Sequence, residues 1–314
     1  SKLRPIPLAA CLVMRAIKTL VILSHRYIGI PLSFFFVMWF VSGYFMIYTG
    51  GMPKVSPDMQ VDGEEAIDFT KVATTPEQAM KAANNDEPPS AILRTILGRP
   101  VYELGDPGYN SSYVYADNGE LMPELTQEQG AELAGRFLDI PVEKFHWQHT
   151  LEHRVDQWTL TVQRELPLYK YTVDDGFGTE VYVSKSANKV SAYTTRKSRM
   201  FAWLGTIPHW MYFEGLRANQ PLWYSIVVWS SYIGCAAALL GLILGVTQFR
   251  KVRPFRLSRA IPYRGMMRWH YILGCVFGVV TLTWVFSGLV SMEPWAWTNA
   301  HGVRVAPDAL SGGD

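Results

Sequence analysis

Two histidines stand at the same point of two similar apolar segments. His25 opens the run His-Arg-Tyr-Ile-Gly, and His270 opens the run His-Tyr-Ile-Leu-Gly. The segments align without a gap, and the aligned pairs are His25 with His270, Gly29 with Gly274, Trp39 with Trp284, Ser42 with Ser287 and Gly43 with Gly288. An ionisable side chain in a membrane segment is costly, so it is by default a candidate functional residue. Two imidazoles at matching depth indicate one metal ion held between them.

Three apolar segments are long enough to carry such residues across a bilayer, for which roughly 20 apolar residues are needed. We expect the first from about Tyr27 to Tyr48, with an apolar lead-in from Leu20, the second from Leu222 to Phe249 and the third from Tyr271 to Met292. All three should be helices, because lipid offers no hydrogen-bond partner to the backbone of an unclosed segment.

The composition fits a chain that lies partly in a membrane. It is 49% hydrophobic and 18% charged, which is too apolar for an ordinary soluble protein and too charged to lie wholly in lipid. The formal net charge of +2 argues neither for nor against nucleic acid, and we expect no nucleic-acid partner. The cysteines are Cys11, Cys235 and Cys275, and none falls in the long region between the first two spans. This excludes a disulfide framework there and argues against a cysteine-ligated iron–sulfur cluster.

Basic residues set the expected orientation. They precede or begin the first span and crowd the loop between the second and third spans; they are Lys2, Arg4, Arg15, Lys18 and Arg26, then Arg250, Lys251, Arg253, Arg256, Arg259, Arg264 and Arg268. The positive-inside rule places both regions in the cytoplasm and the long stretch from about 50 to 220 on the other side.

The expected organisation has seven parts. They are a cytoplasmic N-terminus with the first membrane helix (1–49), an outer α+β domain (50–200), an aromatic interfacial segment (201–221), the second membrane helix (222–249), a basic cytoplasmic loop (250–268), the third membrane helix (269–292) and an outer tail (293–314).

The outer domain is predicted to contain two copies of a helix followed by antiparallel strands. The first copy has a helix capped at Thr75 and running to Ala83, strands at Ala91–Leu97 and Val101–Leu104, and a hairpin from Tyr113–Tyr115 that turns at Asp117-Asn118-Gly119. The second has a capping box at Thr126 and Gln129, a helix to about Leu138, strands at Gln157–Val162 and Leu168–Val173, and a hairpin of Val181–Ser184 with Val190–Tyr193 that turns at Ser186–Asn188.

These helix-then-hairpin units resemble the PepSY domain, and the spans around them resemble the PepSY-associated transmembrane family. The residues that carry the resemblance are His25-Arg26-Tyr27-Ile28-Gly29, Trp39, Ser42-Gly43, Asp156-Gln157-Trp158-Thr159, Trp203-Leu204-Gly205, His209-Trp210, Phe213, His270 and Ser287-Gly288. Some members are haem-containing reductases of ferric siderophores in the bacterial inner membrane. The resemblance therefore implies a multi-pass inner-membrane protein with its large domain in the periplasm. Members often carry a fourth span, so the question whether a further haem ligand lies on a helix beyond Asp314 stays open.

His25 and His270 are the expected axial ligands of one haem b. The helical repeat of 3.6 residues places each histidine on the same face as its glycine, tryptophan and Ser-Gly pair, and small residues let a flat macrocycle or a neighbouring helix approach. Two imidazoles give haem iron with no labile position, which suits electron transfer. Arg26 and Arg268 flank the histidines and are candidates to pair with the haem propionates. The alternatives are interfacial histidines with plain helix packing and ordinary positive-inside arginines.

A second haem near the outer face is expected, because electron transfer falls steeply with distance and one haem at the inner edge leaves most of the bilayer uncrossed. His209, in an aromatic segment typical of a membrane interface, is the first candidate ligand, and His301 is its candidate partner. The alternative is an interfacial His209 and a His301 that only belongs to the tail.

Three further histidines lie close together in Phe145-His146-Trp147-Gln148-His149-Thr150-Leu151-Glu152-His153. Their spacing would suit a metal only if this stretch were helical. It lies where a helix gives way to strands, so we interpret His146, His149 and His153 as solvated polar residues.

The sequence thus predicts a cytochrome b that carries electrons outward to a ferric siderophore and releases Fe(II) for uptake. Besides the siderophore, the expected partners are membrane lipid and an electron donor such as quinol or a cytoplasmic reductase, because no G-x-G-x-x-G dinucleotide signature is present. The alternative is a haem-free sensor or regulator of a periplasmic peptidase. A permease is disfavoured, because the second and third spans hold no polar pathway apart from histidine.

Overall fold

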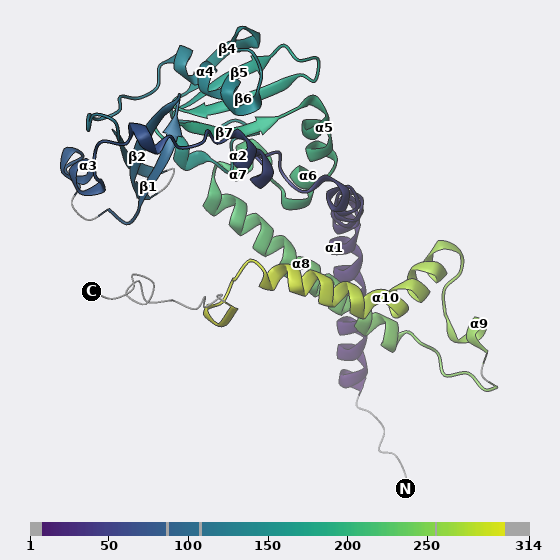
Figure 1. Cartoon of the computed structure of the whole chain (residues 1–314). Helices are drawn as coiled ribbons and strands as arrows, with labels where there is room; N and C mark the ends of the chain where they lie inside the picture. The colour runs from purple at the N-terminus through teal and green to yellow at the C-terminus, as the bar shows by residue number, and fades with distance from the viewer. Residues whose placement is uncertain (1–7, 86–87, 107–108, 255, 299–314) are drawn as a thin grey trace. The chain divides into compact units, whose positions relative to one another are not determined.

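The protein is described from a computed structural model, which covers residues 8–85, 88–106, 109–254 and 256–298 (Figure 1). Contacts divide the chain into two compact units, and each is described by itself. The first unit comprises Ser1–Met38 with Asn219–Asp314, and the second comprises Trp39–Ala218.

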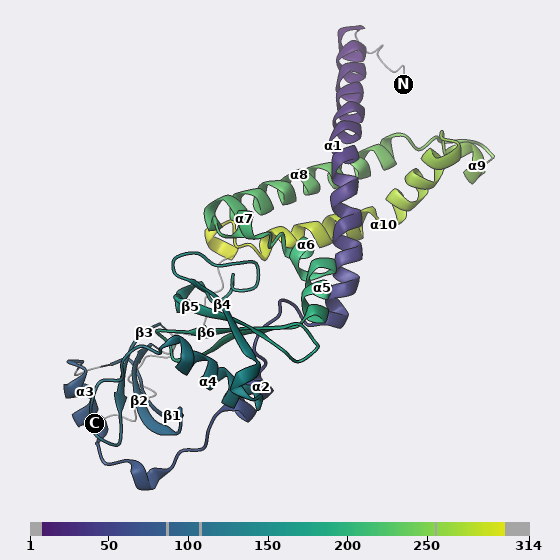
Figure 2. The same ribbon diagram turned by 90° about the horizontal axis from the view of Figure 1, so that it is seen from above.

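The first unit is helical. It contains the N-terminal part of α1 (Leu8–Thr49), then α8 (Gln220–Thr247), the short α9 (Leu257–Ala260), α10 (Gly265–Val290) and a 3-10 turn at Ala296–Thr298. Helices α8 and α10 run side by side (Figures 1 and 2).

Small residues bring α8 and α10 together. A Cβ atom added to Gly234 would lie 3.0 Å from Val285, one added to Gly245 would lie 3.0 Å from Cys275, and one added to Gly278 would lie 2.7 Å from Leu242. Close backbone approach through glycine is the usual way in which membrane helices pack.

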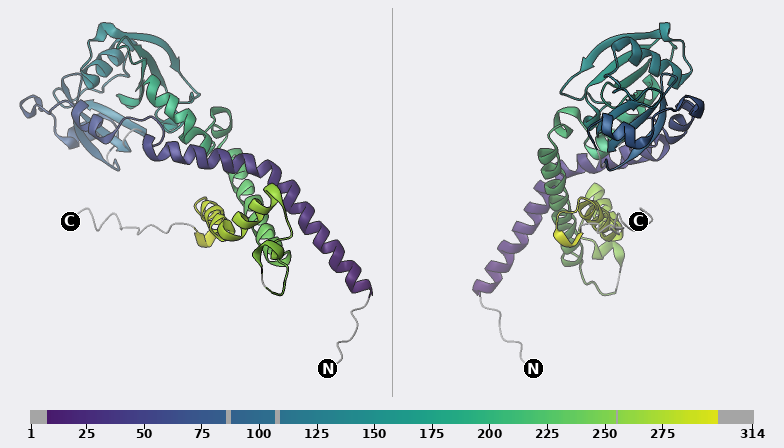
Figure 3. Two further views of the ribbon diagram at one scale, coloured as in Figure 1. Left: turned by 90° about the vertical axis from the view of Figure 1, so that its right-hand side faces the viewer. Right: turned by 60° about the vertical axis from the view of Figure 1, so that its left-hand side comes forward.

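Within the described residues, three helices are long and apolar enough to cross a membrane, over Leu12–Tyr48, Gln220–Thr247 and Gly265–Val290. The expectation of three membrane helices is confirmed. The predicted start of the first helix was wrong, because α1 is one continuous helix from Leu8 (Figure 3). Its first turns are rich in alanine, leucine, methionine and lysine, which favour helix, so the helix extends beyond the apolar segment.

The second unit is an α+β domain with two antiparallel sheets. The first sheet has the order β1-β2-β3 and comprises β1 (Ala91–Ile96), β2 (Arg99–Asp106) and β3 (Tyr109–Tyr115). The second has the order β4-β5-β6-β7 and comprises β4 (Phe145–Leu151), β5 (Leu168–Val173), β6 (Thr179–Ser184) and β7 (Lys189–Thr194).

Short helices accompany both sheets. They are α2 (Pro57–Gly63), α3 (Pro76–Ala82), α4 (Gln127–Leu138), α5 (Arg196–Leu204), α6 (Thr206–Trp210) and α7 (Glu214–Arg217), with 3-10 turns at Phe69–Lys71, Val142–Lys144 and Gln163–Glu165. Both predicted helix starts are confirmed, since Thr75 with Gln78 and Thr126 with Gln129 form capping boxes. Each half of the domain therefore begins with a capped helix that is followed by its sheet, as the repeat pattern predicts.

The predicted strand at Gln157–Val162 was wrong, and the first strand of that half is instead β4. Residues 157–162 alternate apolar and polar, which resembles a strand, but the Asp156 carboxylate accepts hydrogen bonds from the backbone N–H groups of Trp158 and Thr159 and closes a turn. β4 pairs with β5 at the edge of the sheet, and its side chains His146 and His149 are exposed. These polar residues interrupt the alternation of apolar and polar residues by which a strand is recognised in a sequence.

The predicted hairpin after Tyr115 is only partly present. The turn forms, because the N–H of Gly119 donates to the carbonyl of Tyr115 at 2.8 Å. The returning chain makes a single bridge, between Val114 and Leu121, and the extended partner of β3 is β2.

Hydrogen bonds around a partly buried ion pair of the first sheet link the two halves of the domain. Glu103 on β2 is 3% exposed, and its carboxylate lies 3.0 Å from the Arg94 guanidinium on β1. Arg94 also donates to the carbonyl of Asn188 at 3.0 Å, and the Tyr113 hydroxyl donates both to Glu103 and to the carbonyl of Ala187. The first sheet is thereby fastened to the turn between β6 and β7.

Replacing Arg94 by methionine is expected to destabilise this domain by about 3 kcal/mol, because Glu103 would stay buried without its cation. The matched control is Arg136→Met, whose ion pairs lie at the surface and should contribute less than about 1 kcal/mol. Pulse proteolysis of the detergent-solubilised chain in urea measures both changes. Equal losses for the two variants would contradict the assigned role of Arg94.

Candidate metal centres

The imidazole rings of His25 and His270 lie next to each other in the helical unit. Their ring centres are 6.1 Å apart and their planes are inclined by 39°. An imidazole nitrogen lies about 1.1 Å from its ring centre and about 2.0 Å from a bound metal ion, so two rings that share one ion have centres roughly 6 Å apart. The pair meets this distance without any rearrangement of the helices.

His25 is oriented by helix α8. Its Nδ1 atom lies 3.0 Å from the carbonyl oxygen of Ala237, and a carbonyl can only accept, so Nδ1 carries the proton and Nε2 is the basic nitrogen. A histidine that donates its other N–H to a backbone carbonyl is the usual arrangement of a metal ligand.

Gly241 allows the His25 ring to approach α8. A Cβ atom at this position would lie 2.8 Å from Cε1 of His25, which is closer than real Cβ contacts come. Any side chain at position 241 would therefore displace the ring.

His270 is exposed, and its helix meets α1 at a second point. The rings of Phe36 and Trp284 have centres 6.3 Å apart. The two contacts follow the same order along both helices. Gly29 and Gly274, which follow the histidines by one turn, would meet no described atom within 4 Å if they carried a Cβ.

The candidate propionate partners lie beside the pair in sequence but make no ion pair with the described residues. Arg26 is exposed, and its guanidinium carbon lies 5.8 Å from the centre of the Tyr27 ring. Arg268 is partly exposed at the start of α10. Both remain available to an acidic group.

His209 lies on α6 and packs against the C-terminal end of α1, within the second unit. Its Nδ1 atom is 3.2 Å from the carbonyl oxygen of Trp39 and 3.2 Å from Oγ of Ser42. A Cβ at Gly43 would lie 3.2 Å from Cε1 of His209, so the glycine admits the ring. Burial lowers the pKa of His209 below its ordinary value of 6.5, partly offset by the bond to Trp39. The ring is therefore neutral near pH 7, as metal ligation requires.

The aligned Ser-Gly pair of α10 has no such neighbour among the described residues. Ser287 donates to the carbonyl of Trp284 in its own helix, and a Cβ at Gly288 would meet no described atom within 4 Å. His301, the candidate partner of His209, lies outside the described residues.

His146, His149 and His153 do not form a cluster of ligands. The first two lie on β4, and all three are exposed. In the described part of the chain, no group of three histidine, cysteine or acidic side chains is arranged to hold a metal ion. Their interpretation as solvated residues agrees with this arrangement.

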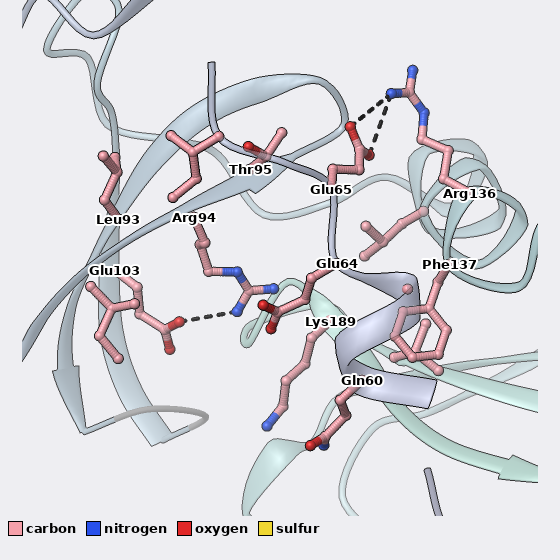
Figure 4. A pocket seen from close by; sticks show the side chains of 15 residues that line it. Gln60, Glu64, Glu65, Leu93, Arg94, Thr95, Glu103, Arg136, Phe137 and Lys189 are labelled. Atoms are coloured by element: carbon pink, nitrogen blue, oxygen red, sulfur yellow. Dashed lines mark hydrogen bonds and ion pairs between the residues drawn. The ribbon is translucent and has the colours of Figure 1, made fainter. Parts of the chain in front are cut away.

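The α+β domain also contains a cavity of about 300 Å³ between α2, α4, β1, β2 and β7 (Figure 4). Its three cations each have an acidic partner: Arg94 pairs with Glu103, Arg136 with Glu65, and Lys189 with Glu165 at 3.0 Å. These three ion pairs compensate the cations that line the cavity.

Sequence analysis missed the contribution of α8 to the His25 site. Ala237 acts through its backbone and Gly241 through the absence of a side chain, so neither has a chemical signature. The available signal was the spacing Gly241-x-x-x-Gly245, which marks a helix face that allows close packing.

Comparison with protein families gives one match. The family described as the PepSY-associated TM region matches residues 23–310. The chain matches no curated protein and no solved structure.

Proposed function

The chain belongs to the PepSY-associated transmembrane family, and from this premise we propose that it is a haem b protein of the bacterial inner membrane that reduces ferric siderophores in the periplasm. The observation that carries the proposal is the pair of histidine rings 6.1 Å apart. Haem iron with two imidazole ligands is a one-electron carrier and has no position for oxygen.

The residues around the pair suit this role. The Ala237 carbonyl fixes the proton of His25 on Nδ1, so that Nε2 can bind iron. Gly29 and Gly274 leave room beside the histidines for a flat ligand, and Arg26 and Arg268 supply guanidinium groups for its carboxylates.

His209 is the proposed ligand of a second haem toward the periplasmic side, with His301 as a candidate partner. Support comes from the neutral, oriented ring of His209 and its contacts with Trp39, Ser42 and Gly43. Two centres would shorten the distance that each electron crosses. The electron donor is proposed to be membrane quinol or a cytoplasmic reductase.

At the periplasmic face, Fe(III) in the siderophore accepts one electron and becomes Fe(II). The softer Fe(II) is a poorer match for hard oxygen ligands, so the chelate weakens and releases the iron. The protein contributes the positions of the electron carriers and a surface for the chelate.

The test is a haem assay on the purified chain, followed by reaction with a ferric siderophore under anaerobic conditions. We expect about two haems per polypeptide by pyridine haemochrome, low-spin spectra, and reoxidation of the reduced α-band as Fe(II) is trapped by ferrozine. A value near one haem would leave His209 and His301 with structural roles. A preparation without a Soret band would refute the proposal and favour the haem-free regulator.

A further inference from the structure

A turn at Asp156–Thr159 joins the second sheet to the segment that carries His209. The Asp156 carboxylate accepts the N–H groups of Trp158 and Thr159 through Oδ1, and through Oδ2 it accepts the hydroxyl of Tyr182 on β6 at 2.6 Å. Tyr182 is fully buried, so the turn is fixed to the core of the sheet.

Gln157, at the top of this turn, bonds the chain beyond α6 on two sides. Its Nε2 donates to the carbonyl of Tyr212 at 2.7 Å, and its Oε1 accepts the N–H of Glu214 at 2.9 Å. Gln157 is only 9% exposed, so both bonds are shielded from water. A single amide side chain thereby satisfies two backbone groups that follow His209 closely.

The same region is held from the other side by packing. Trp158 contacts the apolar cluster of Met52, Ala202 and Ile207, and Ile207 lies on α6 together with His209. The N–H of Tyr212 returns to the carbonyl of Ile207 at 2.8 Å and closes α6. All of these contacts, from Asp156 to α6, lie within the second unit.

We infer that Gln157 is a positioning residue, which fixes α6 so that His209 keeps its Nδ1 on the Trp39 carbonyl and its Nε2 available as a ligand. The outer domain then does more than dock a substrate, because its Asp-Gln-Trp-Thr turn sets the orientation of a membrane-proximal histidine. The consequence for a haem rests on the proposed function, whereas the orientation of His209 does not.

The first test needs no haem. In haem-depleted protein, diethyl pyrocarbonate labels accessible neutral histidines, and mass spectrometry gives the rate at each position. Gln157→Leu removes both hydrogen bonds and is expected to raise labelling of His209 on the order of tenfold, since each buried bond contributes severalfold to an equilibrium constant. Labelling of the exposed His146, His149 and His153 should stay unchanged and serves as the internal reference.

Two further variants make the test specific. Gln163→Leu is the matched control, because Gln163 is exposed in the same domain, and it should leave His209 labelling at the wild-type rate. Gln157→Glu keeps the acceptor for Glu214 but sets a carboxylate oxygen against the Tyr212 carbonyl, so it should also raise the labelling of His209 above the wild-type rate. It also serves as the decisive variant if Gln157→Leu does not fold.

In the haem-loaded chain, Gln157→Leu is expected to change the low-spin spectrum and midpoint potential of the centre that depends on His209, and to leave the centre of His25 and His270 unchanged. Wild-type labelling of His209 in both Gln157 variants would overturn the inference. In protein that holds two haems per polypeptide, a wild-type spectrum in Gln157→Leu would overturn it as well. If the protein holds one haem, the proposed second centre fails, and labelling alone decides the role of Gln157. If the wild-type chain binds no haem, the proposed function fails, and labelling alone decides the role of Gln157.

Discussion

Replacing His25 or His270 by alanine is expected to abolish binding of one haem while the other centre remains. Each histidine would supply one of two axial bonds, and loss of a ligand should cost more than the roughly 10–100-fold in affinity that an outer hydrogen-bond partner contributes. The measurement is pyridine haemochrome per polypeptide together with the reduced-minus-oxidised spectrum. The two single variants should give the same result, because the two ring centres are 6.1 Å apart, a distance at which both rings can share one iron ion.

The control for this experiment is His153→Ala, since His153 is exposed in the α+β domain. It should keep the full haem content. Full haem in both His25→Ala and His270→Ala would show that the ligands lie elsewhere, and the assignment of this pair would then be wrong.

Replacing Gly241 by valine is expected to weaken the same centre without changing any ligand. The Cβ would lie 2.8 Å from Cε1 of His25, so the ring must move and lose its bond to the Ala237 carbonyl. Because that bond orients the ligand, we expect haem affinity to fall roughly 10–100-fold. Titration of haem into the haem-depleted chain, followed at the Soret band, measures the change.

Ala236→Val is the matched control, because Ala236 is an exposed position on the same helix and its substitution adds comparable bulk. It should bind haem as the wild type does. Equal affinity in Gly241→Val and wild type would contradict the orienting role of α8. Such a result would leave the histidine pair itself to be judged by its alanine variants.

Much of the fold could be predicted because its signals are local. Long apolar runs identify the three membrane helices, and the hydroxyl cap at Thr75 and the spacing of Thr126 to Gln129 identify two helix starts. Strand β5 was predicted with its observed bounds, Leu168–Val173. In each case the interactions that determine the structure are made between residues close in sequence or with the surrounding lipid.

Predictions failed where a side-chain hydrogen bond, or the position of a strand within its sheet, outweighed the local pattern of apolar and polar residues. Residues 157–162 alternate like a strand, yet the Asp156 carboxylate closes a turn there. β4 has polar side chains because it lies at a sheet edge, and edge position depends on partners elsewhere in the chain.

The sequence alone determined the membrane character of the chain, its family and the matched histidines His25 and His270, because hydropathy, motif order and internal repetition are properties of the chain itself. Only the tertiary structure decided which groups lie against His25 and His209. The Ala237 carbonyl and the bare backbone of Gly241 contact His25, and the amide of Gln157 bonds the backbone that follows His209, each across a contact between distant segments. Their effect depends on how helices and turns are placed in space. A backbone carbonyl or a missing side chain leaves no chemical signature in the sequence from which such a contact could be predicted.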